Sequence, residues 1–170
     1  MASEADEIKF RQKIAPHFDT GYSLARWLTG SDADAADVLQ EACIKAYRFI
    51  EALESDSPRA WFCRIVRNTA YTLLKNRRQF VELEAESGLQ DESPGPDEVL
   101  LAGVGAQVLH EALNSLPVRY REVLVLRELE EASYEEIAMI LRVPSGTVMS
   151  RLSRARGLLK RKLISKEGLL

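Results

Sequence analysis

Residues Ser133–Lys162 read SYEEIAMILRVPSGTVMSRLSRARGLLKRK, and this stretch decides the fold of the C-terminal part of the chain. It opens with a capping box, in which Ser133 and Glu136 satisfy each other's backbone N–H groups at a helix start. A Pro-Ser-Gly sequence interrupts the apolar pattern after one short helix, and a second helix then ends in a dense basic run. Two helices joined by a tight turn in this way predict a helix-turn-helix.

The second helix is expected from about Thr147 to Lys162. Its inward stripe is expected to be apolar, with residues at steps of four, three and four: Val148, Leu152, Ala155 and Leu159. The opposite face is small and polar, as a helix deep in a major groove requires, with two larger flanking residues: Gly146, Ser150, Ser153, Gly157, Met149 and Arg154.

Of these groove-facing residues, Arg154 is expected to bond a guanine edge. The other cations are expected nearer the phosphates: Arg151, Arg156, Lys160, Arg161 and Lys162. Cations are favoured at any helix C-terminus, so the last basic residues alone would not indicate DNA. The capping box, the turn and the stripe together do.

Toward the N-terminus, a helix is expected from about Asp34 to Ile50. Its inward stripe is expected to be apolar: Val38, Leu39, Ala42, Cys43, Ala46, Phe49 and Ile50. Its outward face surrounds one aliphatic side chain with polar ones: Asp37, Gln40, Glu41, Ile44 and Arg48. A small apolar centre inside a polar rim is typical of protein interfaces, although single exposed aliphatics are common. The pattern indicates a partner surface centred on Ile44.

A third helix is expected over Arg59–Gln79, after a turn at residues 55–58. It contains no acid and mixes bases with aromatics: Arg59, Arg64, Arg67, Lys75, Arg77, Arg78, Trp61, Phe62 and Tyr71. This mixture suits single-stranded or melted nucleic acid, whose bases stack on rings while cations hold the backbone. For Trp61, Phe62 and Ile65 themselves, a place in the core is the preferred interpretation. The continuous positive face is what favours nucleic acid.

Between these helical parts, residues 84–98 read EAESGLQDESPGPDE, which has the composition of a linker. Residues 81–110 carry seven acidic side chains and no Lys or Arg, whereas residues 151–166 carry seven bases and no acid. The small net charge of −3 therefore conceals two segments of opposite charge, an acidic linker and a basic C-terminal tail. Strand signals are nearly absent. The expected fold class is all-α, with two small helical domains joined by a flexible acidic linker.

Several function classes find no support in the residues. No nucleophile–base pair, metal cluster or glycine-rich phosphate loop is visible, so we expect no catalytic residue, no cofactor and no metal. No run reaches the roughly 18 apolar residues of a membrane span. The start MASEADEIKF lacks the features of a secretory signal. A cytoplasmic, non-enzymatic protein without membrane insertion is expected.

Three segments resemble extracytoplasmic-function sigma factors, group 4 of the sigma-70 family of RNA polymerase specificity subunits. Residues 34–50, DAADVLQEACIKAYRFI, look like their polymerase-binding segment, and residues 59–78, RAWFCRIVRNTAYTLLKNRR, look like their −10 recognition helix. Residues 113–159 look like their −35-binding helix-turn-helix. The likeness covers residues from about 10 to 165, and the segments occur in the family's order.

The resemblance implies region 2 at residues 1–80, a linker at 81–105 that threads the polymerase channel toward the RNA exit, and region 4 at 106–170. The implied partners are core RNA polymerase, through its β′ clamp helices and β flap, promoter DNA and an anti-sigma factor. The residues implied to dock on the clamp helices are Asp37, Gln40, Glu41, Ile44, Lys45 and Arg48.

The resemblance also implies two sets of DNA-contacting residues. Those at the −10 element, where the turn Glu54–Arg59 captures a flipped base, are Asp56, Ser57, Arg59, Trp61, Arg64, Arg67, Asn68, Lys75, Arg77 and Arg78. Those at the −35 element are Ser145, Thr147, Met149, Ser150, Arg151, Ser153, Arg154 and Arg156.

Two departures from the family pattern leave details of recognition open. Met149 stands where many relatives carry arginine, which alters the expected −35 contacts, and the turn before Trp61 is short, which leaves the captured base unidentified. A second function also stays open at this point. A stand-alone helix-turn-helix regulator, with residues 1–80 as a sensing or dimerising module, would bind specific duplex DNA without polymerase.

Overall fold

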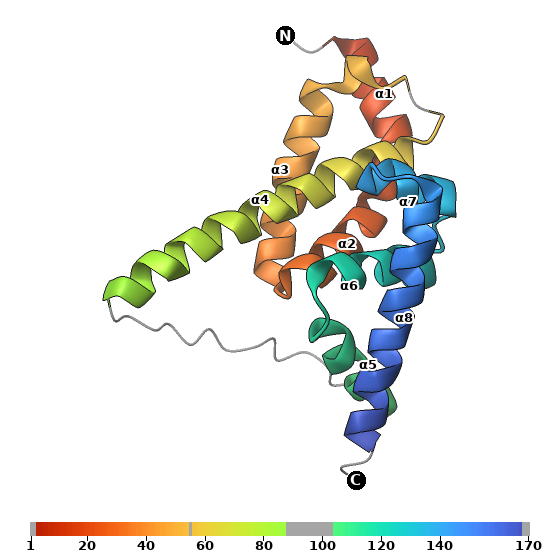
Figure 1. Cartoon of the computed structure of the whole chain (residues 1–170). Coiled ribbons are helices and arrows are strands. Elements are labelled where there is room, and N and C mark those ends of the chain that lie inside the picture. Colours follow the sequence, from red (N-terminus) through yellow and green to blue (C-terminus); the bar gives the residue numbers. More distant parts are fainter. Residues whose placement is uncertain (1–2, 55, 88–103, 168–170) are drawn as a thin grey trace. The chain divides into compact units, whose positions relative to one another are not determined.

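The computed structural model describes residues 3–54, 56–87 and 104–167, and it divides into two units, Met1–Pro96 and Asp97–Leu170. Every element within these described ranges is helical, which confirms the all-α prediction. Unit 1 contains α1 (Glu4–Lys13), η1 (Ala15–His17), α2 (Phe18–Thr29), α3 (Asp32–Arg48), η2 (Ile50–Ala52) and α4 (Pro58–Ser87) (Figure 1). Unit 2 contains α5 (Val104–Asn114), α6 (Val118–Leu124), the π-helix η3 (Val125–Leu129), α7 (Tyr134–Leu141) and α8 (Ser145–Glu167).

The core of unit 1 lies where α2, α3 and α4 pack against one another. Leu24, Val38 and Phe62 are almost wholly buried there, one from each helix. Burying each such side chain stabilises the fold by about 1.5–3 kcal/mol. Gly21 on α2 allows the closest approach, because a Cβ at that position would lie 2.8 Å from the Phe62 ring. The three helices therefore hold each other in fixed positions.

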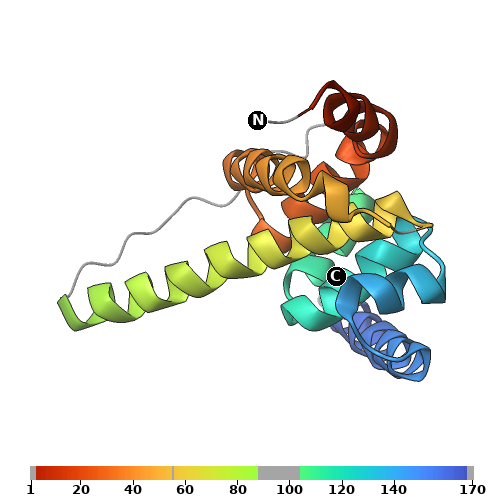
Figure 2. The same ribbon diagram turned by 90° about the horizontal axis from the view of Figure 1, so that it is seen from above.

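Two details of unit 1 differ from the expectations. The sequence pattern places Phe49 in the inward stripe of the second helix, but α3 ends at Arg48 and the Phe49 side chain is 55% exposed. The prediction for Phe49 is therefore wrong, because the helical period that would carry it inward stops one residue earlier. In addition, α4 extends to Ser87, past the expected end at Gln79 and into the expected linker. Figures 1 and 2 both show its last turns extending beyond α2 and α3.

In unit 2, α8 packs against α5, α6 and α7. The capping box at the start of α7 is present: the Ser133 hydroxyl accepts from the Glu136 N–H at 3.1 Å, and the Glu136 carboxylate accepts from the Ser133 N–H at 3.1 Å. Arg121 on α6 donates to three carbonyls at the end of α5 and just after it, which fixes the corner between these helices. The predicted helix-turn-helix is therefore α7, its turn and α8.

The turn of the helix-turn-helix contains a backbone conformation that suits glycine. Arg142 ends α7 in the left-handed region, with φ 55° and ψ 48°. This region costs a residue with a β-carbon about 1–2 kcal/mol, partly offset by the greater freedom of glycine in the unfolded chain. We expect Arg142→Gly to raise the free energy of unfolding of unit 2 by about 0.5–1 kcal/mol.

Urea unfolding followed by circular dichroism would measure this effect. Both tryptophans, Trp27 and Trp61, belong to unit 1. An unfolding transition that appears in circular dichroism but not in tryptophan fluorescence therefore reports unit 2. Arg142→Ala is the matched control, since it removes the side chain and keeps the β-carbon. An equal gain in the alanine variant would contradict the backbone explanation.

Candidate polymerase and nucleic-acid interfaces

The α8 helix presents the two faces that the sequence predicts. Val148, Leu152 and Ala155 are buried, and Leu159 is half-buried. Of the groove-facing residues, Gly146, Met149, Ser150, Ser153 and Arg154 are exposed and Gly157 is half-buried. Among the other residues implied at the −35 element, Ser145 and Arg156 are exposed and Thr147 and Arg151 are half-buried. The angular prediction for α8 is confirmed, and the buried stripe aims the small polar face away from the rest of unit 2.

Two groups on this face already have partners within unit 2. The Ser150 hydroxyl donates to the Thr147 carbonyl at 3.0 Å, so its lone pairs remain for a donor on DNA. Arg156 pairs with Glu128 at 2.7 Å, and this hydrogen bond raises the pKa of its guanidinium. Both side chains are about half exposed, where an ion pair is weak enough to exchange for a phosphate. The Met149 side chain, 52% exposed, offers only apolar contact there.

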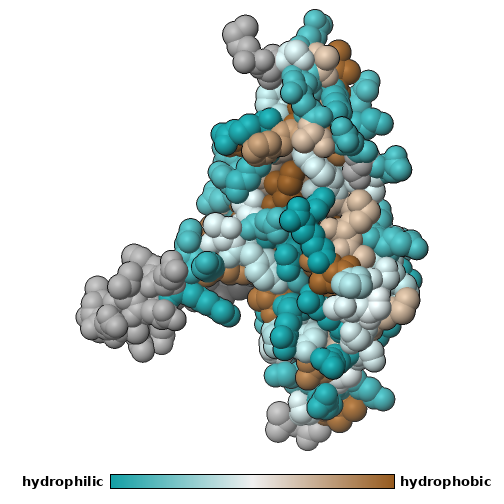
Figure 3. All heavy atoms as spheres, turned by 45° about the horizontal axis from the view of Figure 1, so that its top comes forward, coloured by the Kyte–Doolittle hydropathy of each residue, from teal (hydrophilic) through white to brown (hydrophobic). Residues whose placement is uncertain are grey.

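The outward face of α3 carries the predicted apolar centre. Ile44 is 49% exposed, and the surrounding polar residues Asp37, Gln40, Glu41 and Arg48 are also exposed. On the face shown in Figure 3, hydrophobic side chains form small patches among hydrophilic ones rather than one continuous area. An exposed aliphatic residue surrounded by exposed polar residues, as Ile44 is on α3, suits a small, specific protein contact.

A hollow of about 290 Å³ lies between this face of α3 and α4. Lys45 spans it, lying 3.5 Å from the Glu41 carboxylate and 3.4 Å from the Thr69 hydroxyl. The sequence pattern missed the α4 wall of this hollow, which consists of Thr69, Thr72, Leu73 and Asn76. These four residues are spaced three, one and three positions apart, so they lie on one face of α4. That spacing was the sequence signal from which the wall could have been predicted. The exposed face of α3 around Ile44 therefore borders a hollow whose other wall is α4.

The positive face of α4 is present, but several of its members also have intramolecular roles. Lys75, Arg78 and Asn68 are exposed, whereas Arg59, Trp61, Arg64 and Arg67 are half-buried. The Arg67 guanidinium lies 4.4 Å from the centre of the Tyr71 ring, which is a cation–π contact. Ser57 caps α4, because its hydroxyl accepts from the Ala60 N–H at 3.3 Å. The core interpretation is confirmed for Phe62, which is fully buried, whereas Trp61 and Ile65 are only half-buried.

Arg77 forms a bidentate ion pair with Asp34 in unit 1. Its guanidinium donates two hydrogen bonds of 2.6 Å to the two carboxylate oxygens of Asp34, in the first turn of α3. The Asp34 side chain is 11% exposed, so the Arg77 guanidinium compensates the negative charge of a carboxylate that has lost most of its water. The pair fastens α4 to the start of α3. The sequence offered no sign of it, because 43 residues separate the partners.

We expect Arg77→Ala to lower the free energy of unfolding of unit 1 by about 1–2 kcal/mol. A fully buried pair would cost about 3–5 kcal/mol, but the Arg77 side chain is 55% exposed and water screens the pair. Tryptophan fluorescence during urea unfolding reports this unit, and Arg78→Ala is the matched control. An unchanged midpoint together with weaker DNA binding would instead make Arg77 a DNA contact only.

Two further findings describe the whole set of described residues. They contain no group of three or more His, Cys, Asp or Glu side chains placed to hold a metal ion. No helix within the described ranges combines the length and the apolar character needed to cross a membrane. Neither cysteine forms a disulfide: Cys63 is buried, and partial burial raises the pKa of the Cys43 thiol.

The geometry defines a class: an all-helical protein with a helix-turn-helix in one unit and, in the other, an exposed helix face around Ile44 beside a basic helix. The family model described as Sigma-70 region 2 matches residues 14–80, and the model described as Sigma-70, region 4 matches residues 106–159. The chain belongs to the extracytoplasmic-function RNA polymerase sigma factors.

The relatives agree with this assignment. The chain is 40% identical over 134 residues to the ECF RNA polymerase sigma-E factor of Escherichia coli K12, covering 72% of this chain and 70% of the relative. It is 34% identical over 147 residues to the ECF sigma factor SigE of Mycolicibacterium smegmatis, covering 84% of this chain and 57% of that one.

Solved structures show the same fold. The sigma factor RpoE of Bartonella quintana, in complex with the anti-sigma factor NepR, has a TM-score of 0.76 and 29% identity, covering 91% of this chain and 96% of that one. CnrH, in complex with the cytosolic domain of CnrY, has a TM-score of 0.66 and 28% identity, covering 92% of this chain and 88% of the other.

Proposed function

We propose that this protein is an alternative sigma factor that binds core RNA polymerase and directs initiation at promoters with its own −35 and −10 elements. The observation that supports this most is the separate match of region 2 and region 4 to units 1 and 2. In this proposal residues 1–80 act as region 2, 81–105 as the linker and 106–170 as region 4. Because α4 ends at Ser87, this helix begins in region 2 and continues into the first residues of the linker.

Each interface has a role in this proposal. The exposed face of α3 around Ile44 docks on the β′ clamp helices, and unit 2 contacts the β flap. The turn before α4 and the bases along α4 hold the displaced −10 strand. The groove face of α8 reads the −35 element, with Arg154 as the residue suited to a guanine edge.

The protein acts by binding and catalyses no reaction. Taking a base out of the stack costs a few kcal/mol. Contacts of the displaced strand with the cations of α4 and with the half-buried Trp61 supply that free energy, since base stacking on an aromatic side chain contributes about 1–3 kcal/mol per base. No bond is made or broken, and the protein works in the cytoplasm beside the polymerase.

An anti-sigma protein controls access to these faces in our proposal. The Bartonella quintana relative was solved with its anti-sigma factor. The exposed residues around Ile44 on α3 and the groove face of α8 are the two surfaces whose cover would prevent initiation. A competition between purified anti-sigma candidates and core polymerase for this chain would identify the inhibitor.

In vitro transcription with purified core polymerase across a promoter library tests the proposal. We expect transcripts only when this chain and core enzyme are both present, from promoters that share one −35 and one −10 sequence. A stand-alone regulator would instead bind specific duplex DNA without polymerase and give no core-dependent transcripts. That outcome would replace the sigma-factor proposal.

A further inference from the structure

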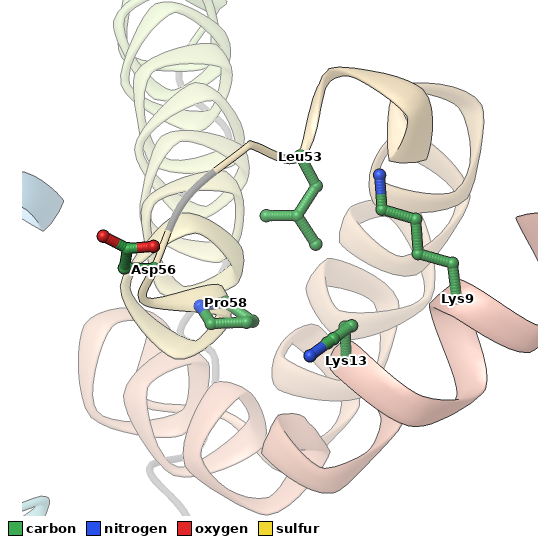
Figure 4. Close-up of a pocket in the computed structure, with 5 residues that line it drawn as sticks. All are labelled: Lys9, Lys13, Leu53, Asp56 and Pro58. Carbon is green, nitrogen blue, oxygen red and sulfur yellow. The ribbon is translucent and has the colours of Figure 1, made fainter.

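A second hollow in unit 1 lies beside the turn that leads into α4. It has a volume of about 240 Å³ and is lined by Lys9 and Lys13 of α1, by Leu53 and Asp56 before α4, and by Pro58 at its start. Figure 4 shows the two lysines on one side of the hollow and Asp56 on the other, with Leu53 and Pro58 between them. This volume is below the roughly 300–1,000 Å³ of pockets for drug-sized ligands, so it suits one small group.

The two lysines stand on a helix that is held firmly against unit 1. A capping box between Ser3 and Asp6 starts α1. The Phe10 ring lies 5.4 Å from the Tyr47 ring and 5.9 Å from the Phe18 ring, and Ile14 directly after the helix is fully buried. The packing of α1 therefore fixes the backbone from which Lys9 and Lys13 reach the hollow.

The charges of the hollow favour an anion. Lys9 and Lys13 are four residues apart on one face of α1, where like charges destabilise a helix. An anion between them removes that repulsion. The positive end of the α4 dipole also lies here, since α4 begins at Pro58. The Asp56 carboxylate, opposite the lysines, can only accept hydrogen bonds and so suits an amino group rather than a phosphate.

We propose that Lys9 and Lys13 bind a backbone phosphate of the displaced single strand and so position it at the turn before α4. This inference rests on the proposed function and adds α1 to it. The region 2 match begins at residue 14, so neither lysine belongs to the matched segment. The bases that follow along α4 continue the same positive track, which is how proteins follow a single-stranded backbone.

The test uses holoenzyme reconstituted from the full-length chain and core polymerase, with a fluorescent single-stranded oligonucleotide of the non-template −10 sequence. For the double variant Lys9→Gln/Lys13→Gln we expect about 3- to 10-fold weaker binding at low salt. We also expect the slope of log K against log salt to become shallower by about 0.7 for each phosphate that the variant no longer neutralises. Binding of a −35 duplex should not change.

Arg11→Gln is the matched control, because Arg11 lies on the same helix, is 77% exposed at its side chain and pairs with Glu7 instead of lining the hollow. An equal loss of affinity in Arg11→Gln would overturn the inference and leave only a general effect of charge. Wild-type affinity and salt dependence in the double variant would also overturn it. Co-elution with core enzyme, measured first for every variant, separates these outcomes from a failure of the proposed function, in which the wild-type chain itself would not form holoenzyme.

Discussion

Replacing Ile44 with Glu is expected to weaken the binding of this protein to core RNA polymerase by roughly 30- to 1,000-fold. Ile44 is the half-exposed apolar centre of the α3 face, and a buried anchor at the centre of an interface contributes about 2–4 kcal/mol. The Glu variant also places a carboxylate in a site that loses its water on binding, which adds a desolvation penalty. The fold should stay intact because the Ile44 side chain is exposed on the outer face of α3 and is not part of the core.

Affinity for core enzyme is measured with the full-length chain by surface plasmon resonance or by competition for a labelled sigma factor. Ile8→Glu is the matched control, since Ile8 is an equally exposed isoleucine, 50% against 49%, on α1. Tryptophan fluorescence checks that unit 1 remains folded in both variants. Wild-type affinity in Ile44→Glu would remove α3 from the polymerase interface, and an equal loss in Ile8→Glu would show that added negative charge alone is responsible.

Arg154→Ala is expected to weaken −35 recognition by about 5- to 150-fold, the 1–3 kcal/mol of a bidentate contact to a base. Arg154 is exposed on the groove face of α8, next to Ser153, and the buried stripe of Val148 and Leu152 fixes its direction. Holoenzyme binding to a −35 duplex and transcription from the matching promoter both measure the effect. The loss should shrink when the contacted guanine is replaced, because the variant no longer distinguishes bases there.

Lys160→Ala is the control for Arg154. Lys160 is also exposed on α8, six residues further from the start of the helix, and is expected near phosphates only. Its removal should weaken binding to all sequences by a similar, smaller factor and reduce the salt slope by about 1. If both variants lose the same affinity with the same salt dependence, Arg154 contacts phosphate and the base-reading role is wrong.

The sequence predicted the elements of the helix-turn-helix because their signals are local. The Ser133 capping box, the Pro-Ser-Gly turn and the buried stripe of α8 each depend on residues within one or two helical turns of one another. Exposure of Ile44 followed from the same period on α3. Helix ends were less certain: α4 extends to Ser87, and the inward stripe of α3 stops before Phe49.

Contacts between distant residues could not be read from the sequence. Arg77 carries the same charge as its neighbours on α4, and only the fold brings it to Asp34 on α3. The same is true of Lys9 and Lys13, which no sequence pattern singles out; only the packing of α1 places them beside the turn before α4. Much of the linker, residues 88–103, lies outside the described residues, so its expected path through polymerase stays a prediction.

The packing of α3 against α4 has a mechanical consequence. The two helices share one core, and the Arg77–Asp34 and Lys45–Thr69 contacts join them at separate points along their length. In the proposed complex, in which α3 binds the polymerase clamp, the orientation of α4 is set with the rigidity of a close-packed interior. The proposed strand-holding surface then lies at a constant offset from the clamp, so differences among promoters are expected to be absorbed by bending of the DNA or by movement outside this pair of helices.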